Sequence, residues 1–233
     1  MKPYIEPEEV DLLEEAATCL RDKLLIRVLF RTGIRVSEAV GLELADVDLG
    51  DRLLRIQQLK ARVRLECSEC GSRLGKSHRF CPGCGKKVDT PRVGEEKRRK
   101  MRVIPLDRGT QALLEKYIQL GGPVERDGRL LLFGIARNTA WGIVRECAWK
   151  ARLGQLVNPD TGKPRGISPH RLRDAFAVMA VQRDDSTDGI RMLQEQLGHA
   201  NIGTTMRYRK VAGQELKEWY EKLWQEEERD GHE

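Results

Sequence analysis

Aromatic residues and long apolar runs are scarce in this chain of 233 residues. Phe, Trp and Tyr together make up 5% of it, and no stretch approaches the ~18 apolar residues that a membrane-spanning helix needs. The N-terminal segment MKPYIEPEEVDLLEE is acidic and lacks the apolar centre of a secretory signal. Because 39% of the residues are hydrophobic, the chain can still bury a core. The sequence therefore predicts a soluble, cytoplasmic protein with no membrane partner.

Neither sign of charge is in large excess overall, but basic and acidic residues are strongly segregated along the chain. The net charge is +6, yet residues 1–51 carry −6, residues 52–102 carry +11, residues 103–213 carry +6 and residues 214–233 carry −5. A basic middle between acidic ends favours binding to a polyanion, most often a nucleic acid. A solvated charged surface is the plainer interpretation, and charge alone does not decide between the two.

Cysteine is infrequent, yet four of the six cysteines follow the spacing C-x2-C-x10-C-x2-C, and each pair is followed by glycine. They are Cys67, Cys70, Cys81 and Cys84. Two such turns facing each other can supply four thiolates in a tetrahedral array, which suits Zn²⁺. A disulfide framework is the rival, but a chain without a secretory signal favours metal. Four protein ligands close the site, so we expect a structural zinc ion.

Apolar periodicity predicts a mainly α (α+β) fold. Helices are expected from Pro7, around 24–32 and 36–42, and over 109–120, 138–152, 169–182, 187–197 and 214–228. Alternating stretches predict strands at 53–61 and 101–105, which makes the cysteine segment an insertion at the tip of a β-hairpin. The stretch 153–168 is expected to be a loop, and the remaining cysteines, Cys19 and Cys147, are expected to be core thiols.

The segment Ser168-Pro169-His170 predicts a helix start, with a capping residue followed by proline at the first helical position. His170 and Arg173 are three residues apart, so they project from one side of this helix near its N-terminus. Free amides and positive potential at that end can hold a phosphate. In isolation, a solvated arginine would be the more ordinary interpretation.

Three motifs in a fixed order give these residues a specific meaning. They are T-G-x-R-x-S-E at residues 32–38, H-x-L-R at residues 170–173, and L-G-H at residues 197–199 followed by T-T-x-x-Y at residues 204–208. In this order they resemble the catalytic domain of the tyrosine recombinase (phage integrase) family over about residues 7–212. The resemblance implies a site-specific recombinase or integrase that acts on double-stranded DNA through a 3′-phosphotyrosyl intermediate.

The resemblance also implies roles for individual residues. Tyr208 would be the nucleophile, and Arg35 and Arg173 would clamp the non-bridging phosphate oxygens. His170 would assist proton transfer at the tyrosine, and His199 would hydrogen-bond the scissile phosphate. Because the phosphotyrosyl bond conserves energy, neither ATP nor a catalytic metal is expected.

A lysine on the β-hairpin is the family's general acid, and two residues compete for that role here. Lys60 stands at the end of the first predicted strand, whereas Lys97 follows a Gly-Glu-Glu stretch, so we favour Lys60. The basic run near the second strand is expected mainly to contact DNA phosphates. It comprises Lys97, Arg98, Arg99, Lys100 and Arg102.

The expected organisation is a catalytic domain over residues 1–62 and 93–213, a zinc ribbon over 63–92 and a helical tail over 214–233. The tail is expected to pack either in cis or on a neighbouring protomer of a homo-oligomer on DNA. Members of the family usually carry an N-terminal helical domain that clamps the other face of the DNA. We expect this clamp to be absent here, supplied by a partner or replaced in part by the zinc ribbon, and we hypothesise the last. Asp174 also departs from the family pattern, which commonly has histidine there.

Two alternatives to a recombinase stay open at this stage. One is a non-catalytic zinc-ribbon regulator that keeps the fold and binds DNA without turnover. The other is a relaxing enzyme similar to type IB topoisomerases, which shares the chemistry without site specificity.

Overall fold

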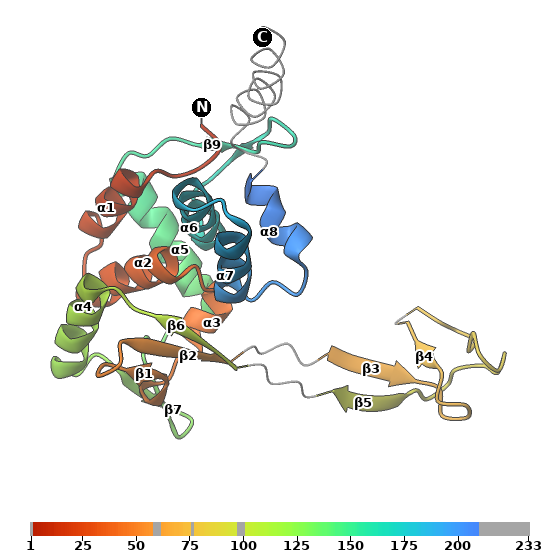
Figure 1. Ribbon diagram of the computed structural model, residues 1–233. Coiled ribbons are helices and arrows are strands. Elements are labelled where there is room, and N and C mark those ends of the chain that lie inside the picture. Colours follow the sequence, from red (N-terminus) through yellow and green to blue (C-terminus); the bar gives the residue numbers. More distant parts are fainter. Residues whose placement is uncertain (1, 58–61, 76, 97–100, 210–233) are drawn as a thin grey trace, which may run out of the picture. The chain divides into compact units, whose positions relative to one another are not determined.

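The computed structural model describes residues 2–57, 62–75, 77–96 and 101–209. The chain forms two compact units (Figure 1): a helical unit, Met1–Ile56 with Arg102–Glu233, and a ribbon unit, Gln57–Met101. None of the described helices is long and apolar enough to cross a membrane.

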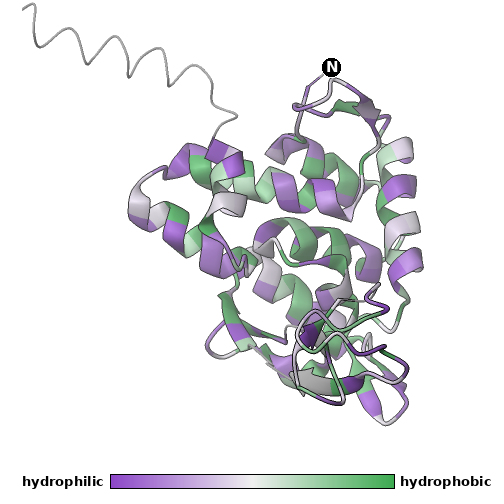
Figure 2. Cartoon of the chain, turned by 90° about the vertical axis from the view of Figure 1, so that its right-hand side faces the viewer, coloured by the Kyte–Doolittle hydropathy of each residue, from purple (hydrophilic) through white to green (hydrophobic). Residues whose placement is uncertain are grey.

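The helical unit is built around α2, which packs against α1, α3, α4, α5 and α6. The helices are α1 (Pro7–Glu15), α2 (Leu20–Thr32), α3 (Val36–Val40), α4 (Arg108–Gln119), α5 (Arg137–Lys150), α6 (Pro169–Arg183), α7 (Thr187–Leu197) and α8 (Ile202–Arg209), with a 3-10 turn at Leu44–Asp46. Hydrophobic and hydrophilic residues alternate along these helices (Figure 2), as amphipathic helices with one face in a core require. In α2 this core face includes Leu24, Leu25, Val28 and Leu29, which are fully buried.

Helix α6 joins two clusters of apolar side chains. Leu172 and Ala175 belong to the main core around α2, whereas Ala177 and Val181 pack with α7. Met206 and Tyr208 of α8 pack against the second cluster. The last two helices of the described chain are therefore held against α6 by apolar burial.

Small antiparallel sheets complete the helical unit. The strands β1 (Val47–Asp48), β2 (Leu53–Gln57) and β6 (Met101–Pro105) form a sheet of order β1-β2-β6. The strands β7 (Val124–Arg126) and β8 (Arg129–Leu131) form a hairpin, and β9 (Leu156–Val157) pairs with β10 (Pro164–Arg165). The mainly helical fold with small antiparallel sheets confirms the prediction from sequence, although the last four strands and α8 as a separate helix were not expected.

The ribbon unit contains β3 (Arg62–Glu66), β4 (Arg73–Leu74) and β5 (Arg92–Glu96) in the order β4-β3-β5. The pairing of β3 with β5 runs from Arg62 opposite Glu96 to Glu66 opposite Arg92. This ladder is antiparallel, so the strand that leads into the cysteine segment and the strand that leads out of it run side by side. The small core of the unit consists of Cys67, Leu74 and Cys81.

The two remaining cysteines differ in their surroundings. Cys147 of α5 is buried, as the sequence indicated. The expectation for Cys19 is wrong, because it is exposed and precedes α2 as the N-cap residue, where its carbonyl accepts from the Lys23 amide.

Candidate active site

Arg173 lies at the meeting point of two helix C-termini. Its Nη1 donates to the carbonyl of Gly33 after α2, and its Nη2 donates to the carbonyl of Leu197 at the end of α7 at 2.7 Å. The last carbonyls of a helix lack intrahelical donors and carry the negative end of the helix dipole, so a guanidinium suits this position. Burial lowers the pKa of Arg173 to about 10, and repulsion from Arg35 adds to the effect. The side chain remains a cation at neutral pH.

Two motif glycines make this convergence possible. Gly33 ends α2 and Gly198 ends α7, both in the left-handed conformation at φ +64°. A Cβ at Gly33 would lie 2.5 Å from Phe176 of α6 and 2.9 Å from Leu197. The T-G and L-G motifs are therefore explained by geometry, because each glycine ends a helix where its final carbonyls meet the buried arginine.

Arg35 is held in place from inside the protein by Glu38. Its Nη1 donates to Glu38 Oε1 at 3.0 Å, and its backbone amide donates to Oε2 at 2.8 Å. Arg102 grips the same carboxylate with two hydrogen bonds, of 3.1 and 2.7 Å, and donates to the carbonyl of Gln196 at 3.1 Å. Burial raises the pKa of Glu38, but the hydrogen bonds and charge of Arg102, together with Arg35, outweigh it and leave the pKa below its usual value. The carboxylate is thus a buried anion shared by two cations.

His199 directly follows Gly198 and contacts both Arg173 and α8. Its Nε2 lies 3.0 Å from Arg173 Nη2, and its Nδ1 lies 2.9 Å from the hydroxyl of Thr205. Since a guanidinium only donates, Nε2 accepts and Nδ1 carries the proton. Burial, and then the charge of Arg173, lower the pKa of His199 to about 4. The imidazole is therefore neutral at physiological pH.

Tyr208 of α8 stacks on His199, with ring centroids 6.4 Å apart and an interplanar angle of 15°. Its hydroxyl donates to Asp174 Oδ1 at 2.9 Å, and Asp174 Oδ2 pairs with Arg171 Nη1 at 2.7 Å. Burial raises the pKa of Tyr208 well above its usual value, and the charge of Asp174 raises it further. The phenol is therefore protonated in the free protein.

The structure brings together only part of the predicted set. Arg173, His199 and Tyr208 form a contiguous group, and Arg35 is close enough to lower the pKa values of Arg173 and His199. His170, one turn before Arg173 on α6, is exposed, and its ring lies edge-on to Trp141 at 6.3 Å. Partial desolvation of the His170 ring, which lies against Trp141, lowers the pKa of this histidine although the residue as a whole is exposed.

The predicted lysines and most of the basic run fall in parts of the chain that the structure does not describe. Lys60 and Lys97–Lys100 lie outside the described residues. Arg102 is described, but its guanidinium is used by Glu38 and the carbonyl of Gln196 inside the helical unit. Contact of Arg102 with phosphate stays a prediction.

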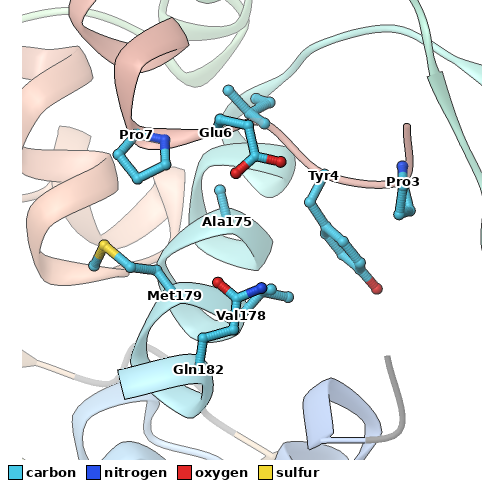
Figure 3. Close-up of a pocket in the computed structure, with 9 residues that line it drawn as sticks. Pro3, Tyr4, Glu6, Pro7, Ala175, Val178, Met179 and Gln182 are labelled. Atoms are coloured by element: carbon cyan, nitrogen blue, oxygen red, sulfur yellow. The ribbon is translucent and has the colours of Figure 1, made fainter. Parts of the chain in front are cut away.

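An open cavity of about 730 Å³ lies beside Tyr208, and Tyr4, Arg165, Arg171 and Asp174 also line it. The N-terminal segment forms one wall and continues along α6. There, Pro3, Tyr4 and Pro7 face Ala175 and Met179 across a smaller cavity of about 120 Å³ (Figure 3). The Arg165 guanidinium lies 5.8 Å from the centre of the Tyr4 ring and donates to the carbonyl of Pro3 at 3.0 Å.

The four cysteines of the ribbon unit gather into one cluster. Their Sγ atoms all lie within 4.8 Å of one another, with Cys67 to Cys84 at 3.7 Å and Cys70 to Cys81 at 3.5 Å. Four thiolates at ~2.3 Å from a central zinc ion would be ~3.8 Å apart at the tetrahedron's edges. The backbone amide of Gly83 donates to Cys81 Sγ at 3.3 Å, as a thiolate ligand would require. This donor set fits a metal ion.

Two residues of the site were not assigned a role from sequence. Glu38 was visible in the first motif, and an acidic residue one helical turn after a motif arginine was the available signal. In the sequence, Asp174 stands out only as a departure from the histidine that the family commonly has there. Its contact with Tyr208 joins residues 34 positions apart, so it depends on tertiary packing of α6 with α8.

Known proteins are similar to this chain in sequence and in fold. The profile of the phage integrase family matches residues 3–67 and 86–215. Tyrosine recombinase XerD of Neisseria meningitidis serogroup B is 33% identical over 201 residues, which cover 83% of this chain and 51% of that protein. The chain thus spans about half the length of this curated relative. The unmatched residues 68–85 contain three of the four clustered cysteines.

Solved structures support the same fold. The crystal structure of XerA recombinase superposes with a TM-score of 0.62 at 22% identity, covering 96% of this chain and 66% of that one. The XerH site-specific recombinase bound to its palindromic difH substrate, a post-cleavage complex, gives 0.59 at 22% identity, covering 94% and 52%. Together with the family match and the XerD identity, this confirms the resemblance read from the three motifs. The chain belongs to the phage integrase family.

Proposed function

We propose that this chain is a tyrosine-type, site-specific DNA recombinase that cuts and rejoins double-stranded DNA through a 3′-phosphotyrosyl intermediate. The observation that carries the proposal is the group formed by Arg173, His199 and Tyr208, with Arg35 close by. These residues come from four separate segments, and their types suit phosphoryl transfer to a tyrosine. The Tn1549 transposon integrase, which shares this fold and was solved in complex with transposon right end DNA, supports double-stranded DNA as the partner.

The proposed reaction assigns a task to each residue. Tyr208 Oη attacks the scissile phosphorus, the bond to the 5′-oxygen breaks, and the 3′-phosphate remains on the tyrosine. Arg35 and Arg173 neutralise the charge that develops on the non-bridging oxygens. His199 is neutral, and it donates to the phosphate once its Nε2 is freed from Arg173 and carries the proton.

His170 and a lysine complete the proposed set. His170 is exposed on the same side of α6 as Arg173, and its proposed task is to assist proton transfer at the tyrosine. Lys60 protonates the departing 5′-oxygen, and Lys97 is the second candidate for that task. The basic run 97–100 with Arg102 contacts phosphates beside the cut. Rejoining reverses these steps, and the reaction uses neither ATP nor a catalytic metal.

The test is covalent capture of DNA. DNA fragments selected by the protein from a random library define a site, and duplexes nicked at successive positions within that site then trap the cleaved state. We expect a covalent protein–DNA adduct with the wild-type chain and none with Tyr208→Phe, which keeps the ring and loses the nucleophile. Tight, specific binding without any adduct would contradict the proposal and favour a non-catalytic regulator. Adducts spread evenly over unselected DNA would instead favour a relaxing, topoisomerase-like enzyme.

We further propose that Cys67, Cys70, Cys81 and Cys84 hold one structural Zn²⁺ within a ribbon over residues 63–92. The support is the tetrahedral spacing of their Sγ atoms. We expect one zinc ion per chain by elemental analysis, lost in Cys67→Ser. Cys19→Ser is the matched control, because that thiol is exposed and lies in the helical unit.

A cytoplasmic location follows from the proposed action on DNA.

The catalytic domain is proposed to comprise residues 1–62 and 93–213, followed by a tail over 214–233 that lies outside the described residues. We propose that copies of the chain assemble on DNA through this tail. The mass of the protein–DNA complex on the selected DNA should rise with protein concentration. Loss of this rise when residues 214–233 are removed would support packing of the tail on a neighbouring copy. An unchanged rise would place the tail in cis.

A further inference from the structure

The hydroxyl of Tyr208 has a defined partner in the free protein. It donates to Asp174 Oδ1 at 2.9 Å, while Arg171 Nη1 fixes the other carboxylate oxygen at 2.7 Å. Arg171 lies one turn before Asp174 on α6, whereas Tyr208 comes from α8. The carboxylate is therefore held with one oxygen on a cation and the other on the phenol.

The phenol needs a proton acceptor to react. Burial, followed by the charge and hydrogen bond of Asp174, raises the pKa of Tyr208, so a preformed phenolate is not available at neutral pH. Attack therefore requires a base that takes the proton while the bond to phosphorus forms. Such a base must lie within about 3.2 Å of the hydroxyl oxygen or reach it through one water molecule.

In the described part of the chain, neither predicted histidine is hydrogen-bonded to the Tyr208 hydroxyl, so the assisting role proposed for His170 leaves the first proton acceptor to be identified. His199 Nε2 accepts from Arg173 and its Nδ1 pairs with Thr205, while the exposed His170 ring lies against Trp141. Among the side chains that the structure describes, Asp174 is the base seen within hydrogen-bond distance of the Tyr208 hydroxyl.

We propose that Asp174 is a catalytic residue that accepts the Tyr208 proton during attack on DNA, an inference that rests on the proposed recombinase function. The Oη–P bond forms, the Oη–H bond breaks and the proton passes to Asp174 Oδ1. The P–O5′ bond breaks, and the 5′-oxygen takes its proton from the lysine. On rejoining, Asp174 returns the proton to the departing phenolate. Protein kinases likewise use an aspartate to accept the proton of an attacking hydroxyl.

Several other charged or titratable groups surround this pair. Arg171 and Arg173 come from α6, Arg165 from β10, Tyr4 from the N-terminal segment, and Asp160 from the turn between β9 and β10. Asp160 pairs with Arg207 at 3.3 Å on the surface and lines the same cavity. Asp160→Asn therefore removes one negative charge from the cavity while leaving the contact between Asp174 and Tyr208 intact.

The test compares single-turnover adduct formation by the wild-type chain, Asp174→Asn and Asp160→Asn on the nicked selected DNA between pH 6 and 9. Asparagine keeps an acceptor oxygen for the phenol but is not a base. We expect Asp174→Asn to react at least ~100-fold more slowly at pH 7, with a rate that rises about tenfold per pH unit because phenolate must now form. The wild type and Asp160→Asn should show nearly flat profiles at similar rates. Asp174→Glu, which restores a carboxylate, should react faster than Asp174→Asn.

Two outcomes count against the proposal, and they are distinct. If the wild type forms the adduct and Asp174→Asn forms it at an equal or faster rate, the role of Asp174 is overturned while the proposed recombinase function stands. The carboxylate would then only hold the resting tyrosine. If Asp174→Asn does not fold, equal rates for Asp174→Glu and Asp174→Ala overturn it in the same way. A wild-type chain that forms no adduct overturns the proposed function and this inference together.

Discussion

The carboxylate of Glu38 lies against the guanidinium of Arg102 in a two-pronged ion pair, with N···O distances of 3.1 and 2.7 Å, and both side chains are largely buried. The same carboxylate holds the side chain and backbone of Arg35. Glu38 therefore connects Arg35, the N-cap residue of α3 for which we propose a phosphate contact, to Arg102 of β6.

Glu38→Gln should destabilise the protein by about 3 kcal/mol, because it leaves two guanidinium groups around a buried site without a counter-charge. Urea unfolding followed by circular dichroism measures this loss. Glu43→Gln is the matched control, since Glu43 pairs with the exposed Arg129 and should cost under about 1 kcal/mol. Equal losses in the two variants would contradict a special role for Glu38.

The free energy of unfolding should depend on pH because the pKa of His199 is lowered in the folded chain. Burial and Arg173 lower its pKa to about 4 in the folded chain, against ~6.5 when unfolded. The unfolded state therefore binds more protons between these values, and stability should fall as pH falls from about 6.5 toward 4. We expect a loss of about 1 kcal/mol between pH 7 and 5, after allowing for partial solvent screening.

Thermal unfolding at several pH values measures how stability changes with pH, and His199→Gln should reduce this change. The pKa of His170 is also lowered, so His170→Gln is the necessary companion variant. Its effect should be smaller, because His170 is exposed and its side chain makes no hydrogen bond within the described part of the chain. A slope that survives both substitutions would contradict the assignment to histidine.

Gly33→Ala should disturb the site through Arg173. Alanine at φ +64° costs ~1–3 kcal/mol of backbone strain, and its Cβ would also lie 2.5 Å from Phe176. The carbonyl of Gly33 would then shift away from the guanidinium that it holds, so both stability and the rate of adduct formation should fall. Gly142→Ala is the control: it lies inside α5 with open space around it and should be neutral or stabilise by up to ~1 kcal/mol.

The sequence predicted the fold well where local patterns decide it. The end of α2 and the boundaries of α6 and α7 follow from apolar periodicity, proline at the start of α6 and glycine after α2 and α7, whereas α2 begins at Leu20, four residues before the expected start. The stretch that contains the two-residue strands β9 and β10 was expected to be a loop. Such short strand pairs depend on tertiary contacts, here the hydrogen bond from the Val157 amide to the Lys2 carbonyl, which the local sequence does not reveal. The position of Cys19 was mistaken for the same reason: periodicity does not reveal that the chain turns between α1 and α2.

The site was only partly predictable, for a physical reason. The motif residues Arg35, Arg173, His199 and Tyr208 could be named from the chain alone, because the family resemblance points to the proposed chemistry. The proton on His199, the shared carboxylate of Glu38 and the pairing of Asp174 with Tyr208 depend on which side chains meet after folding. Such contacts between distant residues leave no periodic trace in a single sequence.

The ribbon unit should contribute to DNA affinity through phosphate contacts. Residues 63–92 carry seven lysines and arginines against three acidic residues, and the antiparallel ladder of β3 with β5 allows the segment to be shortened. Deleting 63–92 and joining the strands should weaken binding and reduce the slope of log K against log salt by about 2 or more, since each lost phosphate contact removes ~0.9. Binding titrations across several salt concentrations measure this slope. Arg79→Ala, which removes one exposed charge, should lower it by at most ~0.9. An unchanged slope after the deletion would mean that the ribbon does not contact DNA.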